Sequence, residues 1–314
     1  MRTLCPDVRV TGSGVVTCLG ASREATLAAL ARDERVCGEP VPFLADSPYA
    51  ACLAVSESVP DVSGCITERR MRKFMSRPAE LAAVAARQAL AQAMPFLRGI
   101  APERMGLYAG VGLAAVDIRA SVEFLRKSLD TKGQFSQAAF AKGGLYAIHP
   151  LWSFHTLANM PACIISVLEN IKGDNGIYTP WEDQAAFALV EAAFALERGD
   201  IDCAVVVASD APGHPASLVE LARAGHLAQG DVAACGAACL VLERADEPSA
   251  PPHAFTLRNM RLALTGGTPK DPLAPFIGRT VAAAPLLLAA LAPYSAVHRS
   301  LAGCGGHVFS FEVA

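Results

Sequence analysis

Glu182 is the residue whose type and position in this sequence most clearly suggest chemistry. It precedes a long Ala-rich helix predicted from about Asp183, which is followed by Gly199-Asp200 and by an apolar strand from Cys203 to Ala208. The N-terminus of a helix carries partial positive charge, so a carboxylate is stabilised there. If burial raised the pKa of this carboxyl group, it could also act as a general acid or base.

The cysteines do not suggest a second chemical centre. There are ten, with no CxxC pair and no Cys/His cluster at the spacing of zinc ligands. Most lie in apolar surroundings, which is typical of small buried side chains in a reducing compartment. We therefore expect no metal site and no disulfide framework.

The elements that position Glu182 alternate between strands and helices. Apolar runs predict strands at Val8 to Val16, Arg104 to Val111, Cys203 to Ala208, Ala237 to Glu243 and Phe255 to Leu264. Helical periodicity runs from Thr67 to Ala93, from Phe154 to Leu168 and from Ala282 to Leu291. Such alternation favours an α/β fold in which helices cover both faces of a sheet.

The first strand carries Gly12 and Gly14, a GxG pair that could suggest a dinucleotide site. The pattern GxGxxG requires a third glycine, and residue 17 is Thr. No cofactor is expected.

Composition limits the partners. The chain has 314 residues, of which 52% are hydrophobic and 18% charged, enough for a large core in one domain or two fused ones. A formal charge of −3 argues against nucleic acid. The N-terminus does not resemble a signal peptide, and no apolar run reaches bilayer-spanning length. A cytoplasmic protein without a membrane span is the expectation.

A basic cluster precedes the helix of residues 77–93. Its members lie between Arg69 and Arg77, in the run RRMRKFMSR. One interpretation is a solvated basic face, and another is a docking surface for an acidic partner.

Several short motifs occur in the order found in one enzyme family. VRVTGSGVVTCLG (8–20) resembles the opening strand and loop of the β-ketoacyl synthases, and RRMRKFMSRPAELAAVAARQAL (69–90) resembles their first long helix. ERGDIDCAVVVASDA (197–211), GHLAQG with AACLVLE (225–243) and GCGGHVFSFEV (303–313) resemble later signatures. The resemblance covers the chain well from 8 to 243, poorly from 244 to 275 and partially from there to the end.

This resemblance implies a thiolase-like fold of α/β/α/β/α layers, built from two similar halves. The chain is short for the family, and the shortfall lies between Glu243 and Gly303. We therefore expect a ketosynthase-like N-terminal half (residues 1–243), a linker (244–254) and a shortened C-terminal half (255–314).

The family's catalytic residues are a Cys and two His, and the resemblance places other residues at all three positions. Glu182 takes the position of the nucleophilic Cys, Leu264 that of the first His and Arg279 that of the second. The nearby Cys163 corresponds to a small residue in a packed helix and is interpreted as structural. His307 corresponds to a residue outside the catalytic pair. The resemblance thus indicates no catalytic residues for condensation.

The preferred interpretation is a catalytically inactive subunit similar to the chain-length factors of type II polyketide synthases. In that family such a subunit pairs with an active β-ketoacyl synthase, and short forms in bacterial aryl-polyene-type pathways are the nearest comparison. The expected partners are an active ketosynthase, as a heterodimer, and an acyl carrier protein.

Two alternatives remain open. One is an altered enzyme, a decarboxylase or another enzyme dependent on acyl carrier protein, in which Glu182 acts as acid or base. The other is a module that binds acyl carrier protein through the basic cluster from Arg69 to Arg77.

Overall fold

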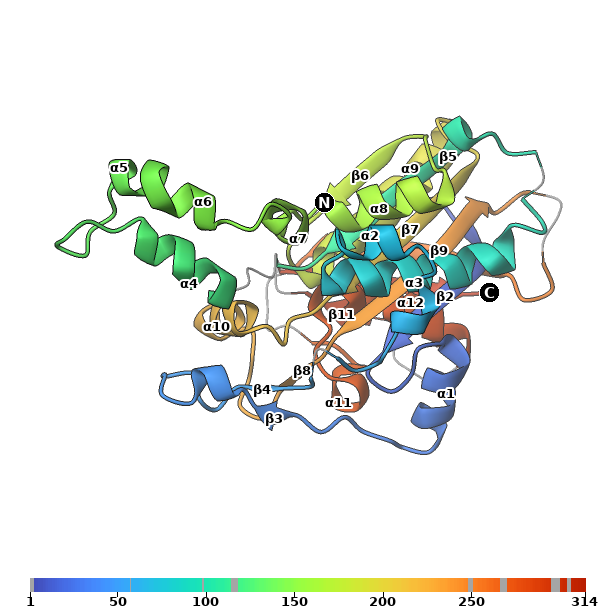
Figure 1. Ribbon diagram of the computed structural model, residues 1–314. Coiled ribbons are helices and arrows are strands. Elements are labelled where there is room, and N and C mark those ends of the chain that lie inside the picture. The colour runs from blue at the N-terminus through green and yellow to red at the C-terminus, as the bar shows by residue number, and fades with distance from the viewer. Residues whose placement is uncertain are drawn as a thin grey trace.

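The protein is described by a computed structural model in which one large mixed sheet is covered by helices (Figure 1). The structure describes residues 3–56, 58–97, 99–113, 118–247, 251–265, 270–294, 300–303 and 306–314. Within these residues the sheet has nine strands, and eight of them follow the order β11-β12-β10-β2-β9-β7-β5-β6. The ninth, β1 (Thr3–Leu4), pairs with β10.

Besides β1, the N-terminal half supplies five of these strands. They are β2 (Val8–Thr17), β5 (Met105–Val111), β6 (Asn175–Tyr178), β7 (Cys203–Asp210) and β9 (Gly236–Arg244). β5 is parallel to β6 and β7, whereas β9 is antiparallel to both β7 and β2. Every residue of β5 and β7 is buried, which explains their continuous apolar sequences.

Helices cover both faces of this half. On one face α3 (Arg77–Ala93) and α8 (Met160–Glu169) share an apolar cluster with β5, β7 and β9. On the other face α9 (Glu182–Arg198) and α12 (Ala284–Leu291) pack against the same strands. α12 is buried along its whole length, so it lies between layers.

Two helices predicted as continuous are broken. Residues 67–93 form α2 (Arg69–Arg72) and α3, and residues 154–168 fall into α7 (Trp152–Thr156) and α8. α3 and α8 each carry a proline in the first turn. Proline lacks the N–H that a continuous helix needs and is favourable where a helix begins, so the chain restarts there.

The C-terminal half repeats part of the N-terminal plan. Its strands β10 (Phe255–Leu264), β12 (His307–Val313) and β11 (Ser300–Ala302) are antiparallel neighbours, as are β2, β9 and β7. α12 precedes β11 as α9 precedes β7. In the described residues this half has no strands corresponding to β5 and β6, which is the shortening expected from the sequence.

The two halves join where β10 pairs with the beginning of β2, Phe255 opposite Val10 and Leu257 opposite Val8. Along β10, buried Leu257, Met260 and Leu262 contribute to the cluster around α9 and α12, whereas Arg258 and Arg261 are exposed. The layered α/β fold with a shortened second half is therefore confirmed, and the outer face of β10 meets solvent at these arginines.

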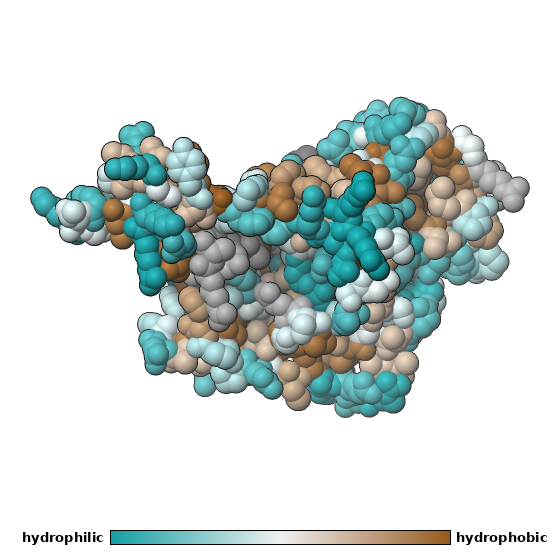
Figure 2. Space-filling view, viewed as in Figure 1, coloured by the Kyte–Doolittle hydropathy of each residue, from teal (hydrophilic) through white to brown (hydrophobic). Residues whose placement is uncertain are grey.

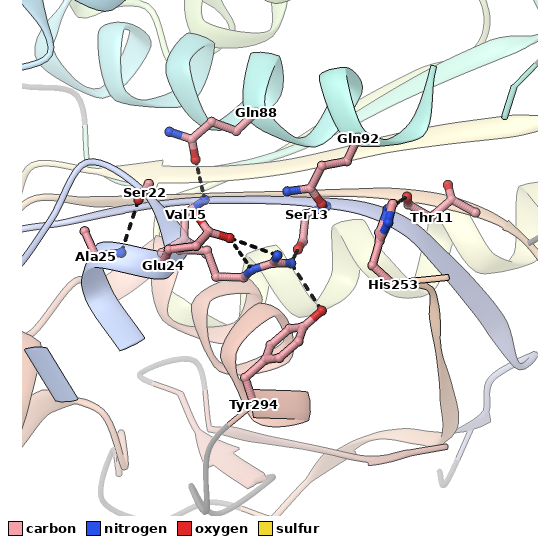
Figure 3. A network of polar contacts seen from close by, with 11 residues as sticks. Thr11, Ser13, Val15, Ser22, Glu24, Ala25, Gln88, Gln92, His253 and Tyr294 are labelled. Carbon is pink, nitrogen blue, oxygen red and sulfur yellow. Dashed lines mark hydrogen bonds and ion pairs between the residues drawn. The ribbon is translucent and has the colours of Figure 1, made fainter. Parts of the chain in front are cut away.

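β10 pairs with β2 only as far as Val10. Beyond that residue, side chains contact the backbone of β2. Gln92 and Gln88 of α3 accept hydrogen bonds from the backbone N–H groups of Ser13 and Val15, at 3.1 and 3.0 Å (Figure 3). His253 contacts the carbonyl oxygen of Thr11 at 2.9 Å. These contacts satisfy backbone groups that would otherwise be buried without partners.

The remaining elements are short. They are β3 (Glu39–Pro40), β4 (Leu53–Ala54), β8 (Val232–Ala233), α1 (Arg23–Ala31), α4 (Ile118–Lys127), α5 (Gln137–Ala139), α6 (Leu145–Ala147), α10 (Pro215–Arg223) and α11 (Ala274–Ile277). The described part of the chain contains no helix long and apolar enough to cross a membrane.

Candidate functional site

The first turn of α9 carries two buried acids, Glu182 and Asp183, each 1% exposed. The first N–H groups of a helix have no partner within the helix, and their partial positive charge favours carboxylates in the first turn. The helix ends at Gly199, whose φ of 71° lies in the left-handed region that suits glycine. The Ala-rich sequence between these ends lets α9 pack closely against the sheet.

Glu182 forms a buried ion pair with Arg279. Arg279 Nη2 donates to Glu182 Oε1 at 2.6 Å, and the two side chains are 7% and 1% exposed. The backbone of Arg279 is fixed on both sides, since its N–H donates to Val232 O at 2.7 Å and its carbonyl accepts from Ala234 N at 3.0 Å. A buried charge is costly unless it is paired, so this contact holds both groups in place.

Asp183 is paired on a different side of the helix. His307 Nδ1 lies 2.8 Å from Asp183 Oδ2, and the imidazole meets the ring of Phe187 edge-on at 5.0 Å between centroids. A Cβ at Gly303 would lie 2.8 Å from Asp183 N. The chain leading into β12 therefore runs directly against the first turn of α9.

Two further acids are buried near this ion pair. Asp210, at the end of β7, accepts from Ala211 N at 2.7 Å and from Ala282 N at 3.1 Å. Burial raises the pKa of Asp210 to about 8, and the charge of Glu182 adds to the increase. Burial also raises the pKa of Asp271 to about 6. At neutral pH the carboxyl group of Asp210 is therefore mainly protonated.

This arrangement is a closed polar interior. The hydroxyl groups of Ser209 and Thr280 are buried and have no hydrogen-bond partner among the described residues. Within the same residues no group of three or more His, Cys, Asp or Glu side chains is placed to hold a metal ion. Among the described residues the site contains the Glu182–Arg279 ion pair, the contact between Asp183 and His307, and the protonated Asp210.

Of the three residues that the sequence resemblance aligns with the family's catalytic positions, the structure brings two together. Glu182 and Arg279 are in contact, but Leu264 is 69% exposed at the end of β10, with its backbone opposite His307 in β12. The interpretation of Cys163 as a packed side chain is wrong: it is exposed on α8. The reason is that α8 buries only its face toward α3 and β5, and Cys163 lies on the other face.

Sequence reasoning missed the supporting acids. Asp183, Asp210 and Asp271 were not identified, although Asp210 ends an apolar strand, VVVASD, where an acid is a noticeable exception. In the basic cluster, Arg69, Arg70 and Lys73 are exposed. Arg77 instead donates to Pro60 O at 2.5 Å and pairs with Glu80.

The comparison with protein families is decisive for the N-terminal half. The family described as "Beta-ketoacyl synthase, N-terminal domain" matches residues 6–247. The chain belongs to the β-ketoacyl synthase family. No curated protein gives a significant sequence match.

Solved ketosynthase structures share this fold. A chain of AntDE:AntF, described as a type II PKS acyl-carrier protein in complex with its ketosynthase bound to the hexaketide, aligns with a TM-score of 0.73 and 15% identity. The alignment covers 98% of this chain and 99% of that one. The matched chain is thus of nearly the same length as this one.

Two other neighbours are longer. The ishigamide ketosynthase/chain length factor aligns with a TM-score of 0.58 and 19% identity, over 86% of this chain and 70% of that one. The ketosynthase ApeO in complex with its chain length factor ApeC from Xenorhabdus doucetiae gives 0.58 and 13%, over 85% and 64%. At these identities the likeness establishes the fold, and the thiolase-like ketosynthase fold expected from the sequence is confirmed.

Proposed function

We propose that this chain is a non-condensing ketosynthase-like subunit. It pairs with an active β-ketoacyl synthase in the cytoplasm, in a bacterial type II polyketide, aryl-polyene-like or fatty-acid pathway. The contact between Glu182 and Arg279 carries the proposal. The sequence resemblance aligns these residues with the family's nucleophilic Cys and second His, and a buried 2.6 Å ion pair joins them.

The replacement removes the chemistry of condensation. The family's reaction needs a thiolate to hold the acyl chain as a thioester, and a carboxylate is a much poorer nucleophile for that purpose. A histidine side chain can accept and release a proton near neutral pH, and arginine is not a replacement for it in that role. Leu264, at the remaining histidine position, has no titratable group.

An open sheet edge supports pairing. Within the described part of the chain β6 is hydrogen-bonded to a strand on one side only, β5. Beside it α8 exposes Cys163 and Val167, and α8 and β6 together line a pocket of about 300 Å³. An unpaired strand next to exposed apolar residues is a surface that a second subunit can cover.

The test is co-expression with an intact ketosynthase of a type II pathway from the same genome. A stable one-to-one complex in native mass spectrometry is expected. Val167→Arg should weaken it roughly tenfold or more, because an unpaired charge would be buried at the interface. Met94→Arg is the control, because Met94 is also largely exposed but lies at the end of α3.

Two results would contradict the proposal. One is a homodimer that ignores the ketosynthase. The other is turnover of a malonyl-carrier protein by this chain alone, lost in Glu182→Gln, which would favour the decarboxylase. Equal weakening by Val167→Arg and Met94→Arg would show that the β6 side is not the interface.

A further inference from the structure

A pocket of about 420 Å³ opens between three segments of the chain around α11 and β8, and is here called the α11 pocket. Its lining residues come from 35–36, from 228–232 and from 270–279. These elements lie beside each other, away from β6 (Figure 1). In the space-filling view the surface of this part of the molecule mixes polar and apolar residues (Figure 2). The charged residues of the pocket therefore indicate what it could hold.

Backbone hydrogen bonds hold the walls of the α11 pocket together. Val36 N donates to Phe276 O at 2.8 Å, and Arg279 N donates to Val232 O at 2.7 Å. Gly278 has a φ of 76°, and a Cβ there would lie 2.8 Å from Val232 O. All three segments are thus tied to one another. The cavity is formed before any ligand enters, as is usual for small-molecule sites.

Asp271 is a buried acid in this pocket with one unpaired oxygen. The residue is 7% exposed, and its Oδ1 accepts a hydrogen bond from Leu273 N at 2.9 Å. Its Oδ2 is buried and has no hydrogen-bond partner among the described residues. Burial raises the pKa of Asp271 to about 6, so the carboxyl group is mainly ionised at pH 7.5. A buried acceptor without a donor is unfavourable, so this oxygen favours a ligand that supplies an N–H group.

A positive charge lies next to this acid. Lys270 also lines the pocket, is exposed, and forms no ion pair with a described residue. It directly precedes Asp271, so the Cα atoms of the two residues are about 3.8 Å apart. An anionic and a cationic group are therefore available to one small molecule at the same time.

These two groups differ from the rest of the pocket. Every other charged side chain that lines it has a partner of its own: Arg35 with Asp33 at 3.2 Å, Asp231 with the N–H of Ala228 at 2.9 Å, and Arg279 with Glu182 at 2.6 Å. A ligand that is only an anion would be repelled by Asp271, and one that is only a cation would be repelled by Lys270. A molecule that carries both charges can be attracted by both residues.

From these observations we infer that the α11 pocket binds a small zwitterion of the α-amino-acid type. The ammonium group of the ligand donates to Asp271 Oδ2, and its carboxylate faces the ammonium group of Lys270. The inference does not depend on pairing with a ketosynthase. It gives the chain a ligand site of its own, which shares Arg279 with the buried ion pair described above.

The experiment begins with a thermal-shift screen of the protein amino acids against the full chain, at pH 7.5 and constant ionic strength. At least one amino acid should raise Tm in a saturable way, because a ligand that binds the folded state stabilises it. Two derivatives of that amino acid are the chemical controls. The N-acetyl form lacks the ammonium group and the amide form lacks the carboxylate, so each should bind at least tenfold more weakly in calorimetry.

Two variants locate the site. Asp271→Asn keeps an oxygen for Leu273 N but removes the charge, and should weaken binding of the amino acid at least tenfold. Lys270→Gln should weaken it roughly threefold or more, and tests the site independently because Lys270 is exposed. Lys172→Gln is the control, because Lys172 is also an exposed lysine but lines the pocket beside β6.

Other outcomes overturn the inference. If no amino acid raises Tm, the pocket is not an amino-acid site and solvent satisfies Asp271. If the N-acetyl form binds as well as the amino acid, the site recognises an anion only, and equal binding of the amide form would show a site for an amine only. Binding that neither Asp271→Asn nor Lys270→Gln weakens lies elsewhere on the chain. The pairing with a ketosynthase stands or fails separately from each of these results.

Discussion

Arg279→Met tests whether the buried ion pair behaves as the geometry requires. The substitution keeps a similar side-chain volume but removes the guanidinium that lies 2.6 Å from Glu182, which is 1% exposed. Two unit charges about 4 Å apart attract by roughly 4 kcal/mol at an effective dielectric constant near 20. Breaking a buried pair on one side typically costs about 3–5 kcal/mol.

A loss of this size should be easy to measure. For a chain of this length it corresponds to a fall in Tm of roughly 5–8 °C, given the usual unfolding entropy per residue. Thermal unfolding at pH 7, followed by circular dichroism, is the assay. Glu182→Gln should cost a comparable amount, because it leaves the guanidinium of Arg279 buried without its carboxylate.

The double variant and a surface control make the test specific. Glu182→Gln/Arg279→Met removes both charges and should lose less than the sum of the single changes. Arg198→Met breaks a pair of similar length, 2.7 Å to Asp200 at the other end of α9, but both side chains are about half exposed. That change should cost far less than Arg279→Met, because solvent screens an exposed pair. If Arg279→Met were as mild as Arg198→Met, the claim that the site is filled by a buried ion pair would be refuted.

Two further predictions concern Asp210. Its folded-state pKa of about 8 is above the usual value, so its stabilising effect is complete at low pH and is lost as pH rises toward 8. Asp210→Asn should therefore flatten the decline in unfolding free energy between pH 5 and 8; an unchanged slope in urea titrations would contradict the assigned pKa. Gly112→Ala would place a Cβ 2.0 Å from the carboxyl carbon of Asp210 and should cost about 1–3 kcal/mol or more, as overpacking does. Gly64→Ala is the control, because there is open space around Gly64. If Gly112→Ala and Gly64→Ala lowered Tm equally, the predicted overpacking at Gly112 would be wrong.

Sequence patterns predicted the central strands and helices because their signals are local. The run at β7 is apolar on both faces, and the boundaries of β10 were predicted exactly. The breaks before α3 and α8 were missed because helical periodicity continues across them, and only the prolines mark the restart.

Long-range contacts account for what the sequence could not provide. Arg279 is 97 positions from Glu182, and His307 is 124 from Asp183. The sequence around Glu182 and Asp183 does not indicate that Arg279 and His307 are their partners. The resemblance aligned Glu182, Leu264 and Arg279 with one site, but Leu264 lies at an exposed strand end because its backbone continues the ladder with β12.

The two halves of the sheet differ in how freely their sequences can change. In β7 both faces are buried, so nearly every substitution alters packing. In β10 the positions of Arg258 and Arg261 face water, where replacement disturbs few contacts. Sequence similarity should fade faster in the second half than in the first. The family match over residues 6–247 concerns the N-terminal domain alone, whereas the fold of a distant relative can be followed over 98% of the chain.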